Sequence, residues 1–325
     1  MEYQNLGKTD LKVSKLGIGT WQLSGPYKLN GFPDGHDYIS KKYVSKLIRY
    51  CADRGINIID CAPIYGNGRG EKIIGSIIQN SRDNWILSTK FGRNNNIKKQ
   101  NSSKMDPKCI VDSLHHSLKN LKTDYLDIFM FHSSPNENNV AECVETLKSL
   151  QDNGKIRYIG ISTESIQDIK LLYDYYKFDV IMFPHSIIDK PKDMLRFIKN
   201  KKIGTMIRGV LKDGRLSGKY FNAKPSFTKN DIRINMSKNI NFNNYSIFKS
   251  IIPDGMSMSQ TAIKYIVDQP TTDTVILGAK NIHDYDEAIK SLGFPKLNFS
   301  KELLIKYLKL KLRLTNSTRF KRIKL

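Results

Sequence analysis

Eight short apolar runs, separated by longer amphipathic segments, constrain the fold of this chain more than any other feature of its sequence. Each run is rich in Ile, Val, Leu or Phe, which is typical of strands buried on both faces. The runs cover residues 16–20, 56–60, 85–90, 125–132, 158–162, 180–183, 205–208 and 275–278. Buried strands that alternate with amphipathic helices predict a parallel sheet covered by helices.

The segments between the runs carry helix signals. The apolar residues of SKKYVSKLIRYCADRG fall on one helical face, and Gly55 at its end is suited to terminate the helix. Asp106 followed by Pro107 is typical of an N-cap and a first helical position. Further helices are predicted near 139–152, 165–176, 193–200, 257–268 and 283–291.

Eight strand-and-helix units in 325 residues favour a closed (β/α)8 TIM barrel over an open α/β sheet. The leading MEYQNLGKTDLKVSK, with a turn at Gly7 and Lys8, predicts an N-terminal β-hairpin before the first barrel strand. No linker divides the chain, so we expect one domain over 1–325, in which 301–325 form a basic C-terminal helix or tail. The irregular stretch 209–256 is long enough for a functional lid or a disordered segment.

The composition is that of an ordinary globular protein, with 39% hydrophobic and 26% charged residues. No apolar run approaches the ~20 residues that cross a bilayer, and the N-terminus lacks the apolar core of a secretory signal. We therefore expect a cytoplasmic protein without a membrane span. The cysteines match no zinc-binding spacing, which predicts reduced thiols; they are Cys51, Cys61, Cys109 and Cys143.

The net charge of +22 is high for a chain of this class. Residues 301–325 hold nine Lys or Arg and one Glu, so a large share of the excess lies in this tail. A basic balance is compatible with an anionic partner, but no zinc finger, RNA-binding signature or aromatic-interleaved basic motif accompanies it. We expect a lysine-rich solvated surface and no specific nucleic-acid partner.

Polar residues collect where the predicted strands end. Asp60, Lys90, His132 and Ser162 each end a different run, and Tyr65 follows Asp60 by five residues. Each has an ordinary structural explanation when it is taken alone. In a barrel the carboxyl ends of the strands share one mouth, which is where active sites lie. Their convergence therefore predicts a catalytic site.

Seven segments, in order along the chain, carry a family resemblance: LGIGTW (16–21), GINIIDCAPIYGNGRGEKIIG (55–75), ILSTKF (86–91), YLDIFMFH (125–132), GKIRYIGIS (154–162), GRLSGKY (214–220) and VILGAK (275–280). The sequence closely resembles the aldo-keto reductase family over about residues 3–292. The resemblance implies a catalytic tetrad, which consists of Asp60, Tyr65, Lys90 and His132.

The chemistry of carbonyl reduction needs these residue types. Hydride transfer builds negative charge on the carbonyl oxygen, which a positioned acid must neutralise. Tyr65 can be that acid, and the Lys90 ammonium is expected to lower its pKa by stabilising the phenolate. Asp60 would hold Lys90 charged and oriented, while His132 would hydrogen-bond the carbonyl oxygen.

The hydride must come from a cofactor, and the chain lacks a G-x-G-x-x-G motif after a strand. The resemblance instead implies NADPH, with NADH as the alternative, extended across the barrel mouth. Ser162 would contact the nicotinamide amide, GRLSGKY would cover the pyrophosphate, and Lys280 would meet the 2′-phosphate. The full set implied by the resemblance is Thr20, Trp21, Asp60, Ser162, Arg208, Leu211, Leu216, Gly218, Lys219, Gly278, Lys280, Asp284 and Glu287.

The sequence departs from the family pattern around the cofactor. Thr163 stands where the family has Asn, and Met182, which cannot hydrogen-bond a carboxamide, stands for Gln. In the adenosine segment, Asp284 replaces Gln or Arg and Ala288 replaces Asn. A carboxylate at Asp284 would repel a 2′-phosphate and keep the preference for NADPH modest.

These departures motivate one rival function, a nucleotide-binding regulatory or interaction subunit with the same fold. The intact tetrad argues against it, because a regulatory protein has no need of all four residues. A metal-dependent hydrolase would need clustered ligands, yet of the six histidines only His132 and His185 lie near predicted strand ends. Neither the substrate nor the oligomeric state is readable in detail. The positive charges of Arg93 and Arg208 favour a small anionic or sugar-derived carbonyl compound.

Overall fold

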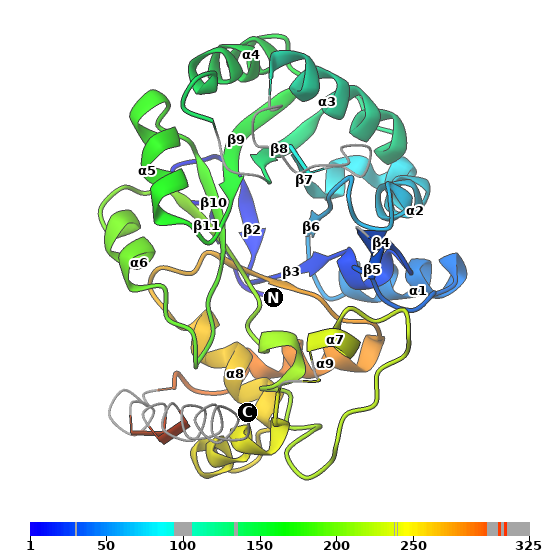
Figure 1. Cartoon of the computed structure of the whole chain (residues 1–325), viewed down its shortest axis with the longest axis vertical. Helices are drawn as coiled ribbons and strands as arrows, with labels where there is room; N and C mark the ends of the chain where they lie inside the picture. The colour runs from blue at the N-terminus through cyan, green and yellow to red at the C-terminus, as the bar shows by residue number, and fades with distance from the viewer. Residues whose placement is uncertain are drawn as a thin grey trace, which may run out of the picture.

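The computed structural model describes residues 1–29, 31–93, 106–132, 136–236, 238, 240–297, 305–306 and 309–310. Within this part of the chain, eight parallel strands close into a barrel (Figure 1). In order around the barrel they are β3 (Leu16–Gly19), β6 (Ile58–Asp60), β7 (Ile86–Phe91), β8 (Leu126–Phe131), β9 (Ile156–Ser162), β10 (Val180–Pro184), β11 (Gly204–Arg208) and β12 (Thr274–Leu277), which pairs with β3. Each predicted run forms one strand, so the predicted (β/α)8 barrel is confirmed.

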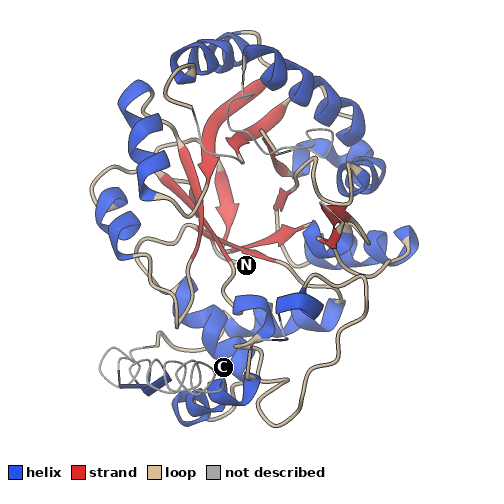
Figure 2. Ribbon diagram, in the orientation of Figure 1, coloured by secondary structure: helices blue, strands red, loops and turns tan. Residues whose placement is uncertain are grey.

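Helices connect the strands and surround the barrel (Figure 2). They are α1 (Lys41–Ala52), α2 (Arg69–Ile78), α3 (Pro107–Leu121), α4 (Val140–Asp152), α5 (Ile166–Tyr175), α6 (Lys192–Ile198), α7 (Arg233–Met236), α8 (Met258–Val267) and α9 (Ile282–Ser291). The predicted N-cap is confirmed, since the Asp106 side chain accepts from the Cys109 N–H. The sequence did not predict α2, because its N-cap, Gly68, has a left-handed backbone and no side chain to signal a helix start.

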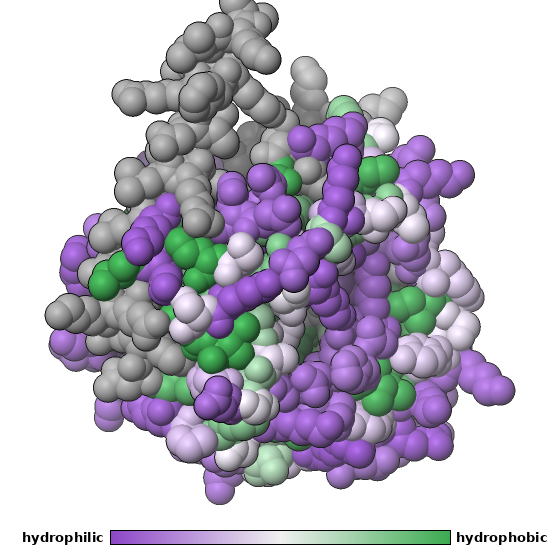
Figure 3. Space-filling view, turned by 90° about the horizontal axis from the view of Figure 1, so that it is seen from below, coloured by the Kyte–Doolittle hydropathy of each residue, from purple (hydrophilic) through white to green (hydrophobic). Residues whose placement is uncertain are grey.

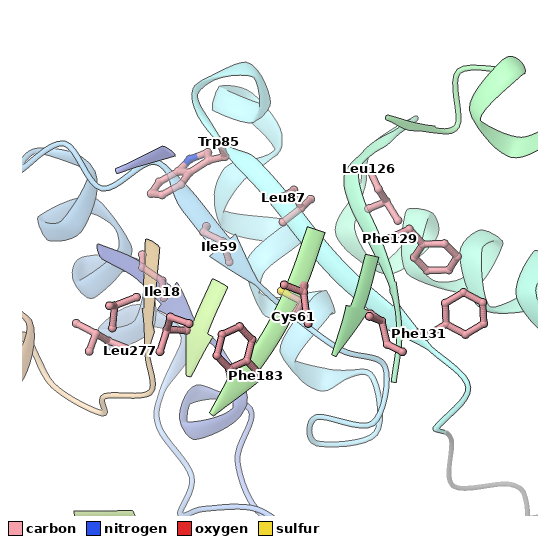
Figure 4. Packing of buried hydrophobic residues seen from close by; sticks show 14 of the residues in the cluster. Ile18, Ile59, Cys61, Trp85, Leu87, Leu126, Phe129, Phe131, Phe183 and Leu277 are labelled. Carbon is pink, nitrogen blue, oxygen red and sulfur yellow. The ribbon is translucent and has the colours of Figure 1, made fainter. Parts of the chain in front are cut away.

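The hydrophobic core has an outer and an inner part. In the outer part, strand side chains such as Ile59, Leu87 and Phe129 pack against the helices (Figure 4). The inner part fills the barrel with side chains that include Ile58, Ile128 and Met206. Strands β7 and β8 are buried along their whole lengths, which explains why they are continuous apolar runs in the sequence.

The predicted N-terminal hairpin forms from β1 (Tyr3–Asn5) and β2 (Lys12–Ser14), which pair antiparallel. Leu6, Leu11 and Val13 join the inner core, and in Figure 1 the N-terminus lies within the ring of strands. The hairpin therefore closes the floor of the barrel, the end at which the strands begin. Because the floor is closed, a ligand must approach from the mouth, the opposite end.

The long connection, residues 209–256 between β11 and α8, is ordered in its described residues rather than structureless. It contains α7 and a 3-10 helix, Phe242–Ile251. Apolar side chains of this connection, among them Leu216 and Phe248, pack in a separate cluster with Met258 of α8. The sequence could not show this, because these apolar residues are scattered among Lys, Asn and Ser.

The predicted basic extension at 301–325 lies largely outside the described residues. Of its described positions, Leu310 is buried in the same cluster as Leu216. No helix in the described part of the chain is both long and apolar enough to cross a bilayer. The face seen in Figure 3 is mostly hydrophilic, with separate hydrophobic groups. All four cysteines are described, and none of them forms a disulfide bond.

Candidate active site

The structure brings the predicted tetrad together at the mouth of the barrel. Asp60 is the last residue of β6, Lys90 lies near the end of β7, and His132 directly follows β8. Tyr65 lies in the turn between β6 and α2, where its N–H donates to the Ala62 carbonyl oxygen at 3.0 Å. Side chains far apart in the sequence converge because parallel strands end at one face.

A buried ion pair forms the base of the site. Lys90 Nζ lies 2.7 Å from each carboxylate oxygen of Asp60, and it also donates to the Cys61 carbonyl oxygen at 2.7 Å. Ser88 Oγ donates to the Asp60 carboxylate at 3.1 Å. Asp60 is 3% exposed and Lys90 is 0% exposed, so each charge is stabilised by the other and not by water. This pairing keeps the pKa of Lys90 above its usual value, although burial alone would lower it.

Tyr65 lies directly above this ion pair. Its hydroxyl oxygen is 3.4 Å from Lys90 Nζ, and its ring stacks on Trp21 with centroids 6.2 Å apart. Burial raises the pKa of Tyr65 above its usual value, and the Lys90 ammonium opposes that rise. Lys90 therefore acts on the pKa of Tyr65 in the predicted direction, but burial outweighs the ammonium and the net shift is upward. The phenol is held protonated at neutral pH.

His132 faces Tyr65 across the mouth. The two rings are perpendicular, with centroids 6.1 Å apart. Burial lowers the pKa of His132 well below its usual value, and the positive charges of Lys90, Arg93 and Arg208 lower it further. The imidazole is therefore neutral at pH 7. Its buried Nδ1 has no hydrogen-bond partner among the described residues.

Other predicted positions surround the tetrad. Thr20 Oγ1 donates to the Asp60 carbonyl oxygen at 3.0 Å, so its side chain fixes the end of β6. Trp21 Nε1 donates to the Asp34 carbonyl oxygen at 3.0 Å. Ser162 ends β9, is 7% exposed and lies in register with Met182 of β10. Ser162 and Met182 therefore lie side by side at the mouth.

Two further positions near the mouth make structural contacts. They are Thr163, which stands where the family has Asn, and the charged residue Arg208. Thr163 Oγ1 donates to the Asp168 carboxylate at 3.1 Å and accepts from the Ser165 N–H at 3.0 Å, which supports the start of α5. Arg208 Nη2 donates to Glu164 Oε1 at 3.0 Å. Arg208 thus ends β11 in an exposed ion pair near the tetrad.

The predicted adenosine residues are engaged by other parts of the protein. Lys280 Nζ donates to Asp231 at 3.0 Å, and Lys219 Nζ donates to Asp284 at 2.9 Å. Lys280 and Asp284 are thus each paired with another residue, Asp231 and Lys219 respectively, and their opposition over one phosphate stays a prediction. The Asp284 carboxylate accepts from Lys219 Nζ at 2.9 Å and from Asn281 Nδ2 at 3.1 Å.

The remaining predicted positions lie in the long connection, just beyond β12 and on α9. Leu216 is fully buried, and Leu211 and Gly218 flank it in the long connection. Gly278 lies so close to Gln22 that a Cβ there would come within 2.3 Å of its amide oxygen. Glu287 lines a cavity of about 670 Å³ between α8 and α9.

Sequence reasoning missed a cluster around Asp231. His36 Nδ1 lies 3.3 Å from Asp231 Oδ2, and Arg233 Nη2 donates to the same oxygen at 2.7 Å. With Lys280, three nitrogen-bearing side chains surround one buried carboxylate. No local pattern signals this cluster, because its members come from the segment after β5 (Phe32–Pro33), the long connection and the segment after β12.

Comparison with known proteins places these features in one family. The aldo/keto reductase family model matches residues 15–302. The aldo-keto reductase YhdN of Bacillus subtilis is 30% identical over 86% of this chain and 85% of its own length. A probable voltage-gated potassium channel subunit beta from Arabidopsis thaliana is 27% identical, covering 90% and 91%. The holo form of an aldo-keto reductase from Bacillus halodurans shares the fold, with a TM-score of 0.77 at 23% identity over 95% and 96% of the two chains.

Proposed function

The chain belongs to the aldo/keto reductase family of NAD(P)H-dependent oxidoreductases, and from this premise we propose that it reduces a small aldehyde or ketone to an alcohol with Tyr65 as the general acid. One observation carries the proposal. The Tyr65 hydroxyl lies 3.4 Å from a fully buried ammonium, that of Lys90, and the Tyr65 ring is perpendicular to the imidazole of His132, with centroids 6.1 Å apart. A carbonyl oxygen placed between these groups would meet a proton donor and a neutral imidazole.

The residues at the mouth fit a nicotinamide dinucleotide. Buried atoms without a partner among the described residues include Ser186 Oγ and His185 Nδ1, both just beyond β10. Such atoms are suited to a polar group that enters the site. Ser162 lies at the neighbouring strand end, and Lys219 and Lys280 supply cations for phosphates.

The proposed proton transfer follows from the environment of Tyr65. A bound NAD(P)H supplies the hydride that adds to the carbonyl carbon. As the π electrons move onto oxygen, the Tyr65 hydroxyl gives that oxygen its proton. The phenolate left behind is stabilised by Lys90, whose charge Asp60 maintains. Uptake of a proton from solvent then restores Tyr65.

We further propose an anionic or sugar-derived carbonyl substrate. The cations of Arg93 and Arg208 both act electrostatically on His132, so positive charge lies near the expected position of the substrate. We propose NADPH as the preferred cofactor and NADH as a second donor, with a small preference because Lys280 is already paired. We also propose that residues 1–325 form one domain, with 301–325 as an extension.

A second candidate, a nucleotide-binding regulatory subunit, is favoured by one observation. Met182 lies beside Ser162 and offers no hydrogen bond to a carboxamide. A relative from Arabidopsis thaliana also has the name of a potassium channel subunit. This candidate requires dinucleotide binding without reduction of any carbonyl, so turnover separates the two.

The test is oxidation of NADPH and NADH by the full chain, followed by absorbance against aldehydes, ketones, keto acids and sugars. We expect turnover with wild type and a loss of ~10²- to 10⁴-fold in kcat for Tyr65→Phe, the usual contribution of general acid catalysis. Dinucleotide affinity should be unchanged in that variant. Wild-type kcat in Tyr65→Phe would remove Tyr65 from the mechanism. Binding without any turnover would favour the regulatory candidate.

A further inference from the structure

The cluster around Asp231 is a closed electrostatic unit beside the mouth. Both carboxylate oxygens are used: Oδ1 accepts from Arg233 Nε at 2.9 Å and from the Arg233 N–H at 3.0 Å, while Oδ2 accepts from Arg233 Nη2 at 2.7 Å and from Lys280 Nζ at 3.0 Å. Asp231 is only 2% exposed. Burial lowers the pKa of His36, so this third neighbour is a neutral imidazole at pH 7.

Asp231 also fixes the path of the long connection. It forms a parallel bridge with Gly35, and the N–H of Ile232 donates to the Gly35 carbonyl oxygen at 3.0 Å. A second contact of the same connection joins Lys219 to Asp284 at the start of α9. The two ion pairs of the long connection, Asp231–Lys280 and Lys219–Asp284, therefore end on Lys280 and Asp284. The family resemblance assigns both of these residues to the adenosine half of the dinucleotide. The long connection therefore neutralises this region with its own charges.

The charge balance of the cluster determines what it can accept. With His36 neutral, the cations of Arg233 and Lys280 face the single negative charge of Asp231. A phosphate monoester carries about 1.5 to 2 negative charges near pH 7. If it approached Lys280 it would compete with Asp231 for the ammonium and be repelled by the same carboxylate, because both are anions. An adenosine ribose with a free 2′-hydroxyl meets neither penalty.

Resting on the proposed function, we propose that Asp231 is a specificity-determining residue: its carboxylate occupies the cation of Lys280 and so limits the preference for a 2′-phosphorylated dinucleotide. The Asp231 carboxylate takes the place beside the Lys280 ammonium that a 2′-phosphate would otherwise take. Its removal creates a free cationic site formed by Lys280 and Arg233. The proposal therefore concerns the balance between NADPH and NADH, and not the chemical step at Tyr65.

The test compares dissociation constants of the full chain for NADPH, NADH, 2′,5′-ADP and 5′-ADP, measured by calorimetry without turnover. In Asp231→Asn we expect NADPH and 2′,5′-ADP to bind roughly tenfold more tightly, as one charge-assisted contact is gained. NADH and 5′-ADP should bind as they do to wild type. An equal change for both nucleotide classes, or no change, would overturn the proposal.

Two further variants keep the test decisive. Asp284→Asn is the matched control, because it releases Lys219 and not Lys280; its effect should be equal for NADPH and NADH. Lys280→Ala leaves Asp231 paired with Arg233, and it should abolish any preference for NADPH while leaving NADH affinity unchanged. If Asp231→Asn does not fold, an equal loss of both affinities in Lys280→Ala overturns the proposal. If wild type binds no dinucleotide at all, the proposed function itself fails, and this inference fails with it.

Discussion

At the floor of the barrel, buried or half-buried aspartates tie neighbouring strands together, whereas at the mouth buried histidine nitrogens have no protein partner in the described part of the chain. Asp127 Oδ2 accepts from the Leu87 N–H at 2.9 Å, and Asp273 Oδ2 accepts from the Thr205 N–H at 2.8 Å. Asp179 does the same for Ile159 at 3.2 Å. Each aspartate lies at or next to the start of its own strand and joins it to an adjacent strand.

Among the described residues, the mouth has a buried charge pair whose members satisfy each other and several buried polar atoms without a hydrogen-bond partner. Asp60 and Lys90 satisfy each other, but Nδ1 of His132 and Nδ1 of His185 are buried without partners among the described residues. An unsatisfied buried polar atom costs stability unless a ligand supplies the missing hydrogen bond. The contrast teaches that the floor holds the fold together, while the mouth retains binding capacity at the expense of stability.

The largest expected effect is that of Lys90→Met. Lys90 lies at the mouth but contributes to both stability and function, so it does not follow the division of roles between floor and mouth. The variant leaves Asp60 buried without its cation, which should cost about 3–5 kcal/mol in the free energy of unfolding. It also removes the group that stabilises the Tyr65 phenolate, so the alkaline limb of the pH–rate profile should move upward. Urea denaturation and pH-dependent kinetics measure both effects.

Lys72→Met is the control for that experiment. Lys72 is an exposed lysine on α2, so its replacement should change unfolding by no more than ~0.5 kcal/mol and leave the pH profile unchanged. A wild-type alkaline limb in Lys90→Met would contradict the coupling between Lys90 and Tyr65, whatever happens to stability.

A smaller effect, confined to stability, is expected for Asp127→Asn at the floor. Arg82 donates to Asp127 at 2.7 Å and Arg157 does so at 2.8 Å. Loss of the buried charge should lower the free energy of unfolding by about 3 kcal/mol, the lower end for a buried pair, because Arg157 is partly exposed. The kcat/KM of the folded protein should be unchanged.

Asp10→Asn provides a matched control, since exposed Asp10 pairs with the same Arg157 at 2.8 Å. An exposed ion pair contributes about 0–1 kcal/mol, so this variant should unfold almost like wild type. If Asp127→Asn reduced kcat/KM as much as stability, the separation of roles between floor and mouth would be wrong.

The sequence predicted the parts of this molecule that depend on local pattern. The eight strands were readable because continuous apolar runs are needed wherever both faces of a strand are buried. The convergence of Asp60, Lys90 and His132 was readable because each lies at or just beyond a strand end, whereas the catalytic tetrad as a set was implied by the family resemblance. The net pKa shift of Tyr65 was not readable, because it depends on burial by side chains from other elements.

Contacts made through the long connection were equally inaccessible. Asp231 and Lys280 are 49 positions apart, and their ion pair depends on the path of the intervening chain. The opposition expected of Asp284 came from family position alone, and a three-dimensional neighbour, Lys219, pairs with it instead. Sequence position can show which residues end near a site, but it does not show which charges neutralise one another there.

The smallest effect is a difference in pH dependence that sharpens the comparison between the two ends. Burial lowers the pKa of His185 to about 4, whereas the unfolded side chain titrates near ~6.5. Below pH ~6.5 the unfolded state therefore takes up a proton that the folded state does not, and stability falls until the pH reaches about 4. For the floor aspartates Asp179 and Asp273 burial raises the pKa, so their contributions have the opposite sign: they add stability as pH falls.

His185→Gln should reduce the loss of unfolding free energy between about pH 7.5 and about pH 5 by about 2 kcal/mol relative to wild type. His115→Gln, at an exposed position of α3, should leave that loss unchanged. The measurement is urea denaturation at the two pH values. An unaltered pH dependence in His185→Gln would mean that the mouth histidine at this position is not held neutral, and the contrast with the floor would then rest on His132 alone.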